Sequence, residues 1–518
     1  MFVRKKKNNS GSTSIQIIAK TRKGTNKLIK TMGCSSNEDE IDRLYKDGLK
    51  FINGPSLFDD SYDEALHYDN IFSNISQNQL RLVGPEYIFG SLFDKIGYGQ
   101  VKTSKPELFR ALVVTRLYRP ASKLRTSEYL SRFMHKYYSS DVIYKYLDEL
   151  CSKKEQPLSE SEEDVKWQVE QVSFEHTKRV VGGEVTVVFY DTTTMYFESR
   201  EDDIRIPGYS KDGKHTKPQI VFGLLVGTGG NPIGYEIHKG NQYEGATLIP
   251  IIKKLQKRFN LPKPIVIADS GLLNKANLNS LETEGYKYIL GGRIKSLSNK
   301  DKQAVLSLGL KSNEVEVVKL GKRKLIVSMN DKRAMKDTKE RDKGLKRLEK
   351  RYQSGNLTKS SLNNRGYNRF LSLSGETTVQ IDLSKIEEDK RFDGLKGYIT
   401  NSDLDKHAII ENYRYLFMIE RAFRFNKTDL DVRPMYHRLI NRIEAHICIC
   451  FVAYTIMLEL ERTLSKANSV ITLHRAMFLA ESIYEIAYVN PYNKKQMSVL
   501  LKTDHDKEVT ELIKLVKK

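Results

Sequence analysis

The sequence contains very little cysteine. Its 518 residues include only four cysteines, at positions 34, 151, 448 and 450. So few and so scattered, they exclude both a disulfide framework and a four-ligand zinc site. Cys448 and Cys450 lie two positions apart in an apolar helical run, so we expect them to be small core residues.

Long apolar runs are also absent. The longest, residues 447–458, is too short to cross a bilayer and predicts a buried helix. The basic start MFVRKKKNN is not followed by an apolar stretch, which excludes a secretory signal. There is no internal repeat and no long low-complexity segment. We therefore expect a soluble, reduced, cytoplasmic protein.

Acidic residues are in deficit. Asp and Glu total 65 against 86 Lys and Arg, which gives a formal net charge of +21 and a pI near 9.4. A surface this basic attracts polyanions, of which nucleic acid is the usual one. A generally lysine-rich proteome would give the same balance, so charge alone does not decide between them. The length allows two to four domains or subdomains.

The first third of the chain divides into two regions. Residues 1–69 form an appendage, with possible strands around 14–19 and 26–31 and an acidic helix near 37–51. Residues 70–180 have helical periodicity, with cations placed between the apolar positions. A helical region with a basic face of this kind could bind the phosphates of the DNA backbone. A solvated helix surface explains that pattern equally well. The cations are Arg110, Arg116, Arg119, Lys123 and Arg125.

Residues 181–292 alternate between strand and helix patterns. A first strand is followed by two more, joined by a Gly-Gly-Asn-Pro turn at 229–232 that is typical of a hairpin. Two helix–strand units follow. This order predicts an α/β, RNase H-like mixed sheet. The expected elements after the first strand are strands 219–228 and 232–239, helix 246–259, a strand ending at 269, helix 274–284 and strand 286–291.

The pattern changes beyond residue 292. Residues 293–405 predict a strand-rich inserted subdomain, which includes a highly charged helix at 331–352. The core resumes at 406–430 with an amphipathic helix that carries Glu420. Residues 431–518 predict a C-terminal helical region. The α/β core would therefore be interrupted by an insertion and flanked by helical regions.

Two short apolar segments each end in an aspartate. The segment VTVVFYD ends at Asp191, and IVIAD ends at Asp269. A buried strand that ends in a carboxylate delivers the charge to the edge of a sheet, where ligands bind in α/β folds. Burying either carboxylate unpaired would be costly. The alternative role for each is to cap a turn, which aspartate often does.

Glu420 lies far downstream on the predicted amphipathic helix. Tyr413, Glu420 and Lys427 are spaced by seven residues, so they share nearly one helix face, and Arg424 joins them. Ordinary pairing on a solvated helix is the alternative for an isolated glutamate. Three converging carboxylates would instead hold divalent metal for phosphoryl transfer on nucleic acid. Each motif alone is weak, and their joint occurrence in this order indicates an enzyme that cuts and joins DNA.

These motifs resemble those of bacterial insertion-sequence transposases of the DDE superfamily, in the group with a Tyr-x2-Arg-x3-Glu-x6-Lys signature. YDTTTMYFE resembles the first-aspartate motif, IADSG the second, and the stretch from Tyr413 to Lys427 the glutamate motif. Further similar stretches are GYSKDG, PQIVFGLLV, GNQYEG and RPMYH. The chain departs from the signature at the arginine position, which holds Leu416. Arg414, Arg421 or Arg424 would then supply that phosphate contact.

The resemblance implies a metal-dependent DNA transposase. Asp191, Asp269 and Glu420 would hold two Mg²⁺ ions, for which Mn²⁺ can substitute, and would cleave the ends of an insertion sequence and transfer them to target DNA. The partners implied are double-stranded DNA, at element ends and target, and a second copy of the chain in a synaptic complex acting at the bacterial nucleoid. The alternatives are an RNase H-like nuclease without strand transfer and an inactive transposase-derived DNA-binding protein. The residues expected to contact DNA are Tyr413, Arg421, Arg424 and Lys427.

Overall fold

The computed structural model divides the chain into two compact units. One unit comprises residues 1–91, 124–139 and 461–518, and the other comprises 92–123 and 140–460. The structure describes all residues except 21–24, 54–78, 152–163, 199–201, 203, 211–212, 214, 244–245, 273–274, 356, 364–365, 375–377, 429, 431–435, 490–494, 503–505 and 518.

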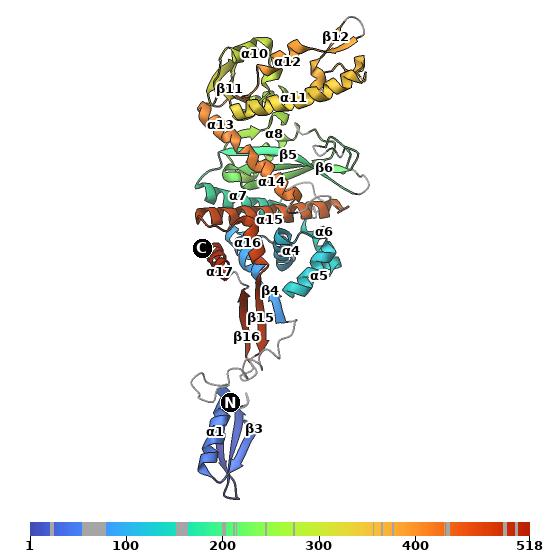
Figure 1. Ribbon diagram of the computed structural model, residues 1–518. Helices are drawn as coiled ribbons and strands as arrows, with labels where there is room; N and C mark the ends of the chain where they lie inside the picture. The colour runs from blue at the N-terminus through green and yellow to red at the C-terminus, as the bar shows by residue number, and fades with distance from the viewer. Residues whose placement is uncertain are drawn as a thin grey trace. The chain divides into compact units, whose positions relative to one another are not determined.

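The larger unit is built on an eight-stranded mixed sheet (Figure 1). Five neighbouring strands run in the order β7-β6-β5-β8-β9, with β5 parallel to β8, β8 parallel to β9, and β6 antiparallel to both β5 and β7. This is the RNase H-like arrangement, so the predicted fold class is confirmed. The strands are β5 (Val187–Tyr196), β6 (Gln219–Gly227), β7 (Pro232–Lys239), β8 (Ile265–Ala268) and β9 (Tyr288–Gly292).

The predicted hairpin joins β6 to β7. Gly227 N donates to Asn231 O at 2.8 Å, which closes the turn. Gly229 and Gly230 adopt φ values of +79° and +83°, a backbone region that suits glycine. Every residue of β6 is buried because helices cover both faces of the sheet there.

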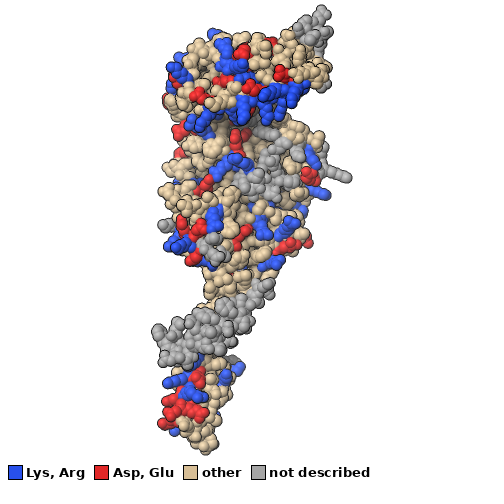
Figure 2. Space-filling view, in the orientation of Figure 1, with Lys and Arg blue, Asp and Glu red and all other residues tan. Residues whose placement is uncertain are grey.

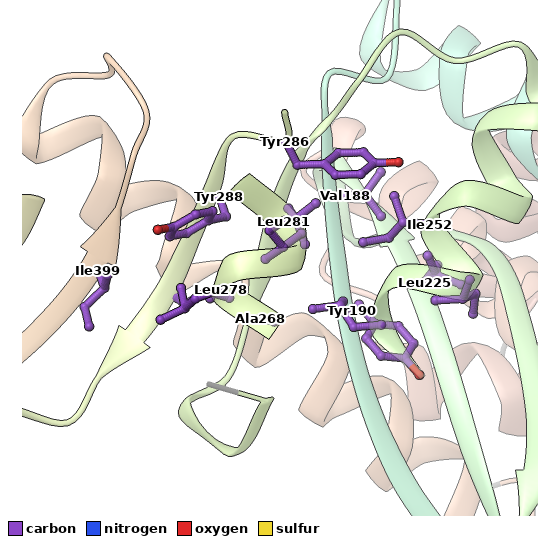
Figure 3. Packing of buried hydrophobic residues seen from close by; sticks show 14 of the residues in the cluster. Val188, Tyr190, Leu225, Ile252, Ala268, Leu278, Leu281, Tyr286, Tyr288 and Ile399 are labelled. Carbon is purple, nitrogen blue, oxygen red and sulfur yellow. The ribbon is translucent and has the colours of Figure 1, made fainter. Parts of the chain in front are cut away.

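Helices form a layer on each face of the sheet. On one face, α8 (Leu248–Phe259) and α9 (Lys275–Thr283) pack their apolar residues against side chains such as Val188 and Tyr190 of β5 (Figure 3). On the other face, α14 (Leu416–Thr428) and α15 (Ile440–Lys466) pack through aromatic contacts. Helix α7 (Val165–Val181) lies along β7. The core is therefore a three-layer α/β/α arrangement.

Helix α15 is a core element. Its 27 residues are long and apolar enough to cross a membrane by composition, but 94% of its most apolar window is buried within the protein. Cys448 and Cys450 are among the buried residues, as expected from the sequence. Leu458, at the end of the predicted apolar run, is buried too. The run is thus explained by packing against the sheet.

The strands of the inserted region belong partly to the same sheet. β14, β11 and β10 continue it beyond β9 as antiparallel neighbours. Val305 packs in the core of the main sheet, whereas the remaining elements pack around a small separate core that includes Leu348 and Phe370. The elements are α10 (Asn299–Leu306), β10 (Val315–Leu320), β11 (Arg323–Met329), α11 (Asp331–Gln353), β12 (Leu371–Ser374), β13 (Thr378–Ile381), α12 (Leu383–Lys390) and β14 (Leu395–Thr400).

The described residues between 83 and 181 are mainly helical, as the periodicity predicts. The predicted basic face is wrong at two positions, however, because Arg116 and Lys123 are only 6% and 5% exposed. Residues 108–109 and 111–117 are buried and Arg110 is half-buried, so α4 lies largely inside the protein. The helices are α4 (Pro106–Tyr118), α5 (Lys123–Met134) and α6 (Ser140–Leu150), with α3 (Ser91–Ile96) before them.

The smaller unit contains two three-stranded sheets. The first pairs β1, β2 and β3 and is covered by α1. The second pairs β16, β15 and β4, so the C-terminal region predicted to be helical also contains strands; the alternation in IYEIAYV favours them. The elements are β1 (Phe2–Lys7), β2 (Thr13–Lys20), β3 (Asn26–Ser35), α1 (Glu38–Asn53), β4 (Leu80–Leu82), α16 (Leu473–Ala480), β15 (Ile483–Val489), β16 (Gln496–Lys502) and α17 (Asp506–Lys517).

Candidate active site

Asp191 lies in the middle of β5. The prediction that the strand ends at this residue is wrong, because the strand continues through the β-branched residues 192–194 to Tyr196. Tyr190 faces the buried cluster beneath α8, so alternation along the strand turns Asp191 to the opposite face of the sheet. Asp191 Oδ1 accepts a hydrogen bond from Thr192 N at 2.7 Å. The carboxylate is therefore displayed on a face of the sheet.

The second aspartate lies beside the first. β5 and β8 pair in parallel with Tyr190 opposite Ala268, so Asp191 and Asp269 are level with each other on neighbouring strands. β8 and β9 pair with Ala268 opposite Leu290, which places Gly291 level with Asp269 on the next strand. Neighbouring strands are about 4.8 Å apart. The fold thus sets the two aspartates and a glycine in one row across the sheet.

Glu420 approaches this row from the covering helices. The single helix predicted for Tyr413, Glu420 and Lys427 is wrong, because the chain makes a turn at Tyr415 between α13 (Lys406–Arg414) and α14. Met418 N donates to Tyr415 O at 2.9 Å, a tighter turn than an α-helix makes. α14 packs on β5, the strand of Asp191. Tyr413 and Glu420 therefore reach the site from two different helices.

All three carboxylates line one cleft. This cavity has a volume of about 990 Å³, and Asp191, Asp269, Glu420 and Tyr413 are among its lining residues. Asp269 and Glu420 are exposed to solvent, and Asp191 is partly exposed. The three carboxylates that the sequence singles out thus line the same cleft.

Tyr413 is fixed against Asp269. Its hydroxyl donates to Asp269 Oδ1 at 3.4 Å, and its ring lies 4.9 Å from the ring of Tyr398 in an edge-to-face arrangement. Burial raises the pKa of Tyr413, and the negative charge of Asp269 raises it further. A Cβ at Gly291 would lie 2.5 Å from the Tyr413 hydroxyl, so only glycine leaves room for it. The tyrosine is thus a neutral hydrogen-bond donor held beside an aspartate.

The sequence did not indicate Lys396, which also lines the cleft. Its Nζ lies 4.7 Å from the ring centroid of Tyr413 and 5.2 Å from that of Tyr398. Burial and then the charge of Arg333 lower the pKa of Lys396, while Asp269 and Glu420 act in the opposite direction. It is therefore a cation placed between aromatic rings and two of the site's carboxylates.

The inserted region supplies a wall of mixed charge. Figure 2 shows Lys and Arg gathered over α11, part of which lines the cleft. Several of these charges are paired: Arg341 contacts Asp393 at 2.5 Å, and Lys295 contacts Asp389 at 2.7 Å. Arg293 donates to Ser270 O at 2.7 Å, next to Asp269. The inserted region thus presents both charge signs on the side of the cleft away from β5.

The predicted DNA contacts are only partly gathered at this cleft. Tyr413 lines it, whereas Arg421 and Arg424 are not among the lining residues, and the side chain of Lys427 lies outside the described residues. Arg414 does line the cleft. Leu416, in the signature's arginine position, is 8% exposed and lines it as well.

The donor set suits a hard divalent cation, which prefers carboxylate oxygens. In the part of the chain that the structure describes, no three His, Cys, Asp or Glu side chains form a preassembled metal-binding group. Asp191, Asp269 and Glu420 therefore share a cleft without a closed coordination shell. Their exposure leaves the carboxylates accessible to an incoming ion.

Comparisons with known proteins identify the domain that carries this site. Residues 183–456 match the family model described as the transposase DDE domain. No curated protein matches the chain in sequence. Among solved structures, a piggyBac transposase synaptic complex with hairpin DNA is similar at 11% identity, covering 82% of this chain and 80% of that one, with a TM-score of 0.38. A Mos1 transposase paired-end complex with the left transposon end is similar at 13% identity, covering 48% of this chain and 66% of that one, with a TM-score of 0.16.

Both TM-scores are low, so the assignment depends on the family model and on the sheet order. The matched span covers β5 to most of α15, which includes all three carboxylates and the inserted region. The chain belongs to the transposase DDE domain family and is a DDE transposase, a divalent-metal-dependent enzyme that cleaves DNA strands and transfers them.

Proposed function

We propose that Asp191, Asp269 and Glu420 are the catalytic carboxylates of this transposase and that together they hold two Mg²⁺ ions, for which Mn²⁺ can substitute. The observation that carries the proposal is that all three line one cleft. The level positions of Asp191 and Asp269 on neighbouring strands support it, because a rigid sheet fixes their separation. Bound divalent ions would lower the pKa of water and stabilise the leaving oxygen of a phosphodiester.

The reaction has two chemically similar steps. In cleavage, a water oxygen attacks phosphorus at the end of the element, the bond from phosphorus to the 3′ oxygen breaks, and a 3′-hydroxyl is released. In strand transfer, that 3′-hydroxyl attacks a phosphodiester of the target, and a new bond replaces the broken one. Tyr413 would donate a hydrogen bond in this cleft, since its raised pKa keeps the hydroxyl protonated.

Arg414 is the best-placed substitute for the arginine missing from the signature. It lines the cleft, and Arg421 and Arg424 do not. A guanidinium there would hold a phosphate flanking the cleaved bond through two hydrogen bonds. We propose that Tyr413 and Arg414 position DNA at the cleft. DNA contacts by Arg421, Arg424 and Lys427 remain predictions from the sequence.

The substrate and assembly follow from the resemblance. We expect the DNA to be the two ends of an insertion sequence and a target duplex, handled by a homodimer acting at the nucleoid of a bacterial cell. Mass photometry of the protein with end DNA tests the assembly. A particle with two chains and two DNA ends is expected, and a single chain per DNA end at saturation would contradict the homodimer.

The activity is tested with the full chain and labelled duplexes taken from either flank of its gene, with Mg²⁺ or Mn²⁺. Glu420→Gln removes the proposed ligand while keeping its shape, and Glu411→Gln is the matched control on α13, since Glu411 is exposed and outside the cleft. Mutating even a residue that only hydrogen-bonds to a metal ligand lowers metal affinity or activity by about 10–100-fold. We therefore expect Glu420→Gln to lower cleavage by more than about 100-fold and Glu411→Gln to leave it unchanged.

The products distinguish the alternatives. Metal-dependent nicks at defined ends together with joined products support transposition. Cleavage without joining would favour a nuclease. Binding without cleavage in either metal would contradict the catalytic proposal for this protein, and full activity of Glu420→Gln would contradict the role of that residue.

A further inference from the structure

Lys396 differs from other cations that share the lining of the cleft. Lys295 pairs with Asp389, and Arg341 pairs with Asp393. In the part of the chain that the structure describes, the Lys396 ammonium has no ion-pair or hydrogen-bond partner, although the side chain is half-buried. Its three N–H donors are therefore available to a ligand that enters the cleft.

Two aromatic rings hold Lys396 in place without cancelling its charge. Nζ lies 4.7 Å from the ring centroid of Tyr413 and 5.2 Å from that of Tyr398, and the two rings meet edge to face. An aromatic face attracts a cation through its quadrupole, whereas a carboxylate would neutralise the charge and occupy the N–H donors. The ammonium is thus positioned and still able to bind an anion.

The register of the sheet places Lys396 next to the row that contains the two aspartates. Tyr398 pairs with Gly291, the residue level with Asp269 on the neighbouring strand. Ile399 packs in the core on the side of α8 and α9, so alternation turns Lys396 and Tyr398 to the opposite face, which is that of the cleft. Two residues along a strand span about 6.8 Å. Lys396 therefore follows the row at an offset comparable with the separation of successive phosphates in a DNA strand.

The ammonium also acts on the carboxylates through its charge. Burial and then the charge of Arg333 lower the pKa of Lys396. The opposing effects of Asp269 and Glu420 on that pKa show that the ammonium interacts with both carboxylates. It therefore offsets part of the negative charge that a divalent ion would meet in the cleft. A phosphate bound to the ammonium would cancel this offset.

We propose that Lys396 is a phosphate-binding residue of the cleft and that it makes metal binding depend on DNA. Its ammonium donates to a non-bridging oxygen of the phosphate next to the cleaved bond, on the side of the inserted region. Without DNA it weakens the attraction of Asp269 and Glu420 for a divalent ion, and the bound phosphate relieves that effect. The inference rests on the proposed function, because it takes these carboxylates as metal ligands.

Metal binding by the full chain without DNA provides the first test. Mn²⁺ is titrated, and the free ion is followed by its paramagnetic resonance signal. Lys396→Met keeps the length of the side chain and removes its charge. Lys319→Met is the matched control, because Lys319 is an exposed lysine of β10 in the same sheet and lies outside the cleft.

The expected result is a gain of metal affinity. A unit charge near a divalent ion in partly exposed surroundings changes the affinity for that ion by about 3- to 10-fold. We expect Lys396→Met to bind Mn²⁺ more tightly by this factor and Lys319→Met to match the wild type. Misfolding or a purely structural role of the lysine would not produce such a gain.

DNA binding in EDTA provides the second test, because no metal takes part. Loss of one phosphate contact lowers the slope of log K against log salt by about 0.9. For a flank-derived duplex we expect Lys396→Met to show this change and to bind about 10-fold more weakly. Lys396→Arg keeps a cation that binds phosphate and should retain most of the affinity.

Single methylphosphonates placed along the duplex identify the contacted phosphate. Each replaces one charged oxygen with a methyl group. At one position, next to the bond that the wild type cleaves, the substitution should weaken wild-type binding about 10-fold and leave the binding of Lys396→Met unchanged. Equal effects on the two proteins at every position would overturn the proposal, and so would wild-type Mn²⁺ affinity in Lys396→Met.

Glu420→Gln separates this inference from the proposed function. It should bind Mn²⁺ at least about 10-fold more weakly than the wild type. Unchanged Mn²⁺ binding by Glu420→Gln would refute the metal site and the coupling to it, and the methylphosphonate scan would then decide the phosphate contact alone. Weaker binding by Glu420→Gln together with unchanged binding by Lys396→Met would overturn only the role of Lys396.

Discussion

Replacing Gly291 by alanine tests whether Tyr413 is held beside Asp269. The added Cβ would lie 2.5 Å from the Tyr413 hydroxyl and 3.1 Å from Ser270 N, where ordinary contact begins at 3.4 Å. The hydroxyl would have to retreat by about 0.9 Å. Its ring is packed against Tyr398, so the movement breaks the 3.4 Å hydrogen bond to Asp269.

The expected cost is large for a single methyl group. Overpacking destabilises by about 1–3 kcal/mol, and a misplacement of about 1 Å near reacting atoms lowers rates by up to about 100-fold. We expect Gly291→Ala to lower the rate of end cleavage by about 10- to 100-fold, measured by single-turnover kinetics. Gly183→Ala is the control, because a Cβ there meets nothing within 4 Å.

A second variant separates crowding from general damage. Tyr413→Phe removes the hydroxyl that the new methyl group would meet, so Gly291→Ala combined with Tyr413→Phe should cleave about as fast as Tyr413→Phe alone. If the rate reductions of the two single variants multiply in the double variant, the added methyl group does not act through the Tyr413 hydroxyl. A wild-type cleavage rate for Gly291→Ala would also contradict the proposed contact.

Two further predictions concern stability. Glu170 is 1% exposed, pairs with the buried Arg258 and accepts from Tyr235 N at 3.0 Å, so Glu170→Ala should destabilise the larger unit by about 3–5 kcal/mol in urea unfolding; a loss below about 1 kcal/mol would contradict this. Burial, and then the charge of Arg116, lower the pKa of Lys123 from 10.5 to about 7. Between pH 7 and 10.5, Lys123 is therefore protonated in the unfolded chain and largely neutral in the folded one. Because the unfolded chain binds more protons, the free energy of unfolding rises with pH in this range, by at most about 1.4 kcal/mol per pH unit. Lys123→Met should raise the melting temperature at pH 7 and have little effect near pH 10.5, and an equal gain at both pH values would rule out a titrating Lys123.

The order of elements in the core followed from the sequence because each element carried its own local signal. The Gly-Gly-Asn-Pro turn and the apolar runs of β6 and β8 can be recognised from the local sequence alone. The prediction that β5 ends at Asp191 is wrong because a carboxylate, although costly to bury, is accommodated within the strand where it faces the cleft. The β-branched residues 192–194 that continue the strand were visible in the sequence.

The finer geometry of the site depends on contacts that no local pattern reveals. The turn at Tyr415 has no proline or glycine to mark it. Lys396 and Gly291 meet Tyr413 only because β14 and β9 are neighbours in the sheet, which is a property of the assembled fold. Similarly, Arg116 and Lys123 have the spacing of surface cations, and only the packing around α4 shows that they are buried.

The most direct test of the central claim, that the three carboxylates form one metal site, is to map the polypeptide around a bound ion. Fe²⁺ replaces Mg²⁺, ascorbate and peroxide generate hydroxyl radicals at the ion, and mass spectrometry locates the backbone cuts. We predict cuts near Asp191, Asp269 and Glu420 that excess Mg²⁺ suppresses and Asp191→Asn abolishes. Cuts confined to the other acidic residues of the cleft, which are Asp337, Glu340, Asp389 and Asp393, would contradict the account.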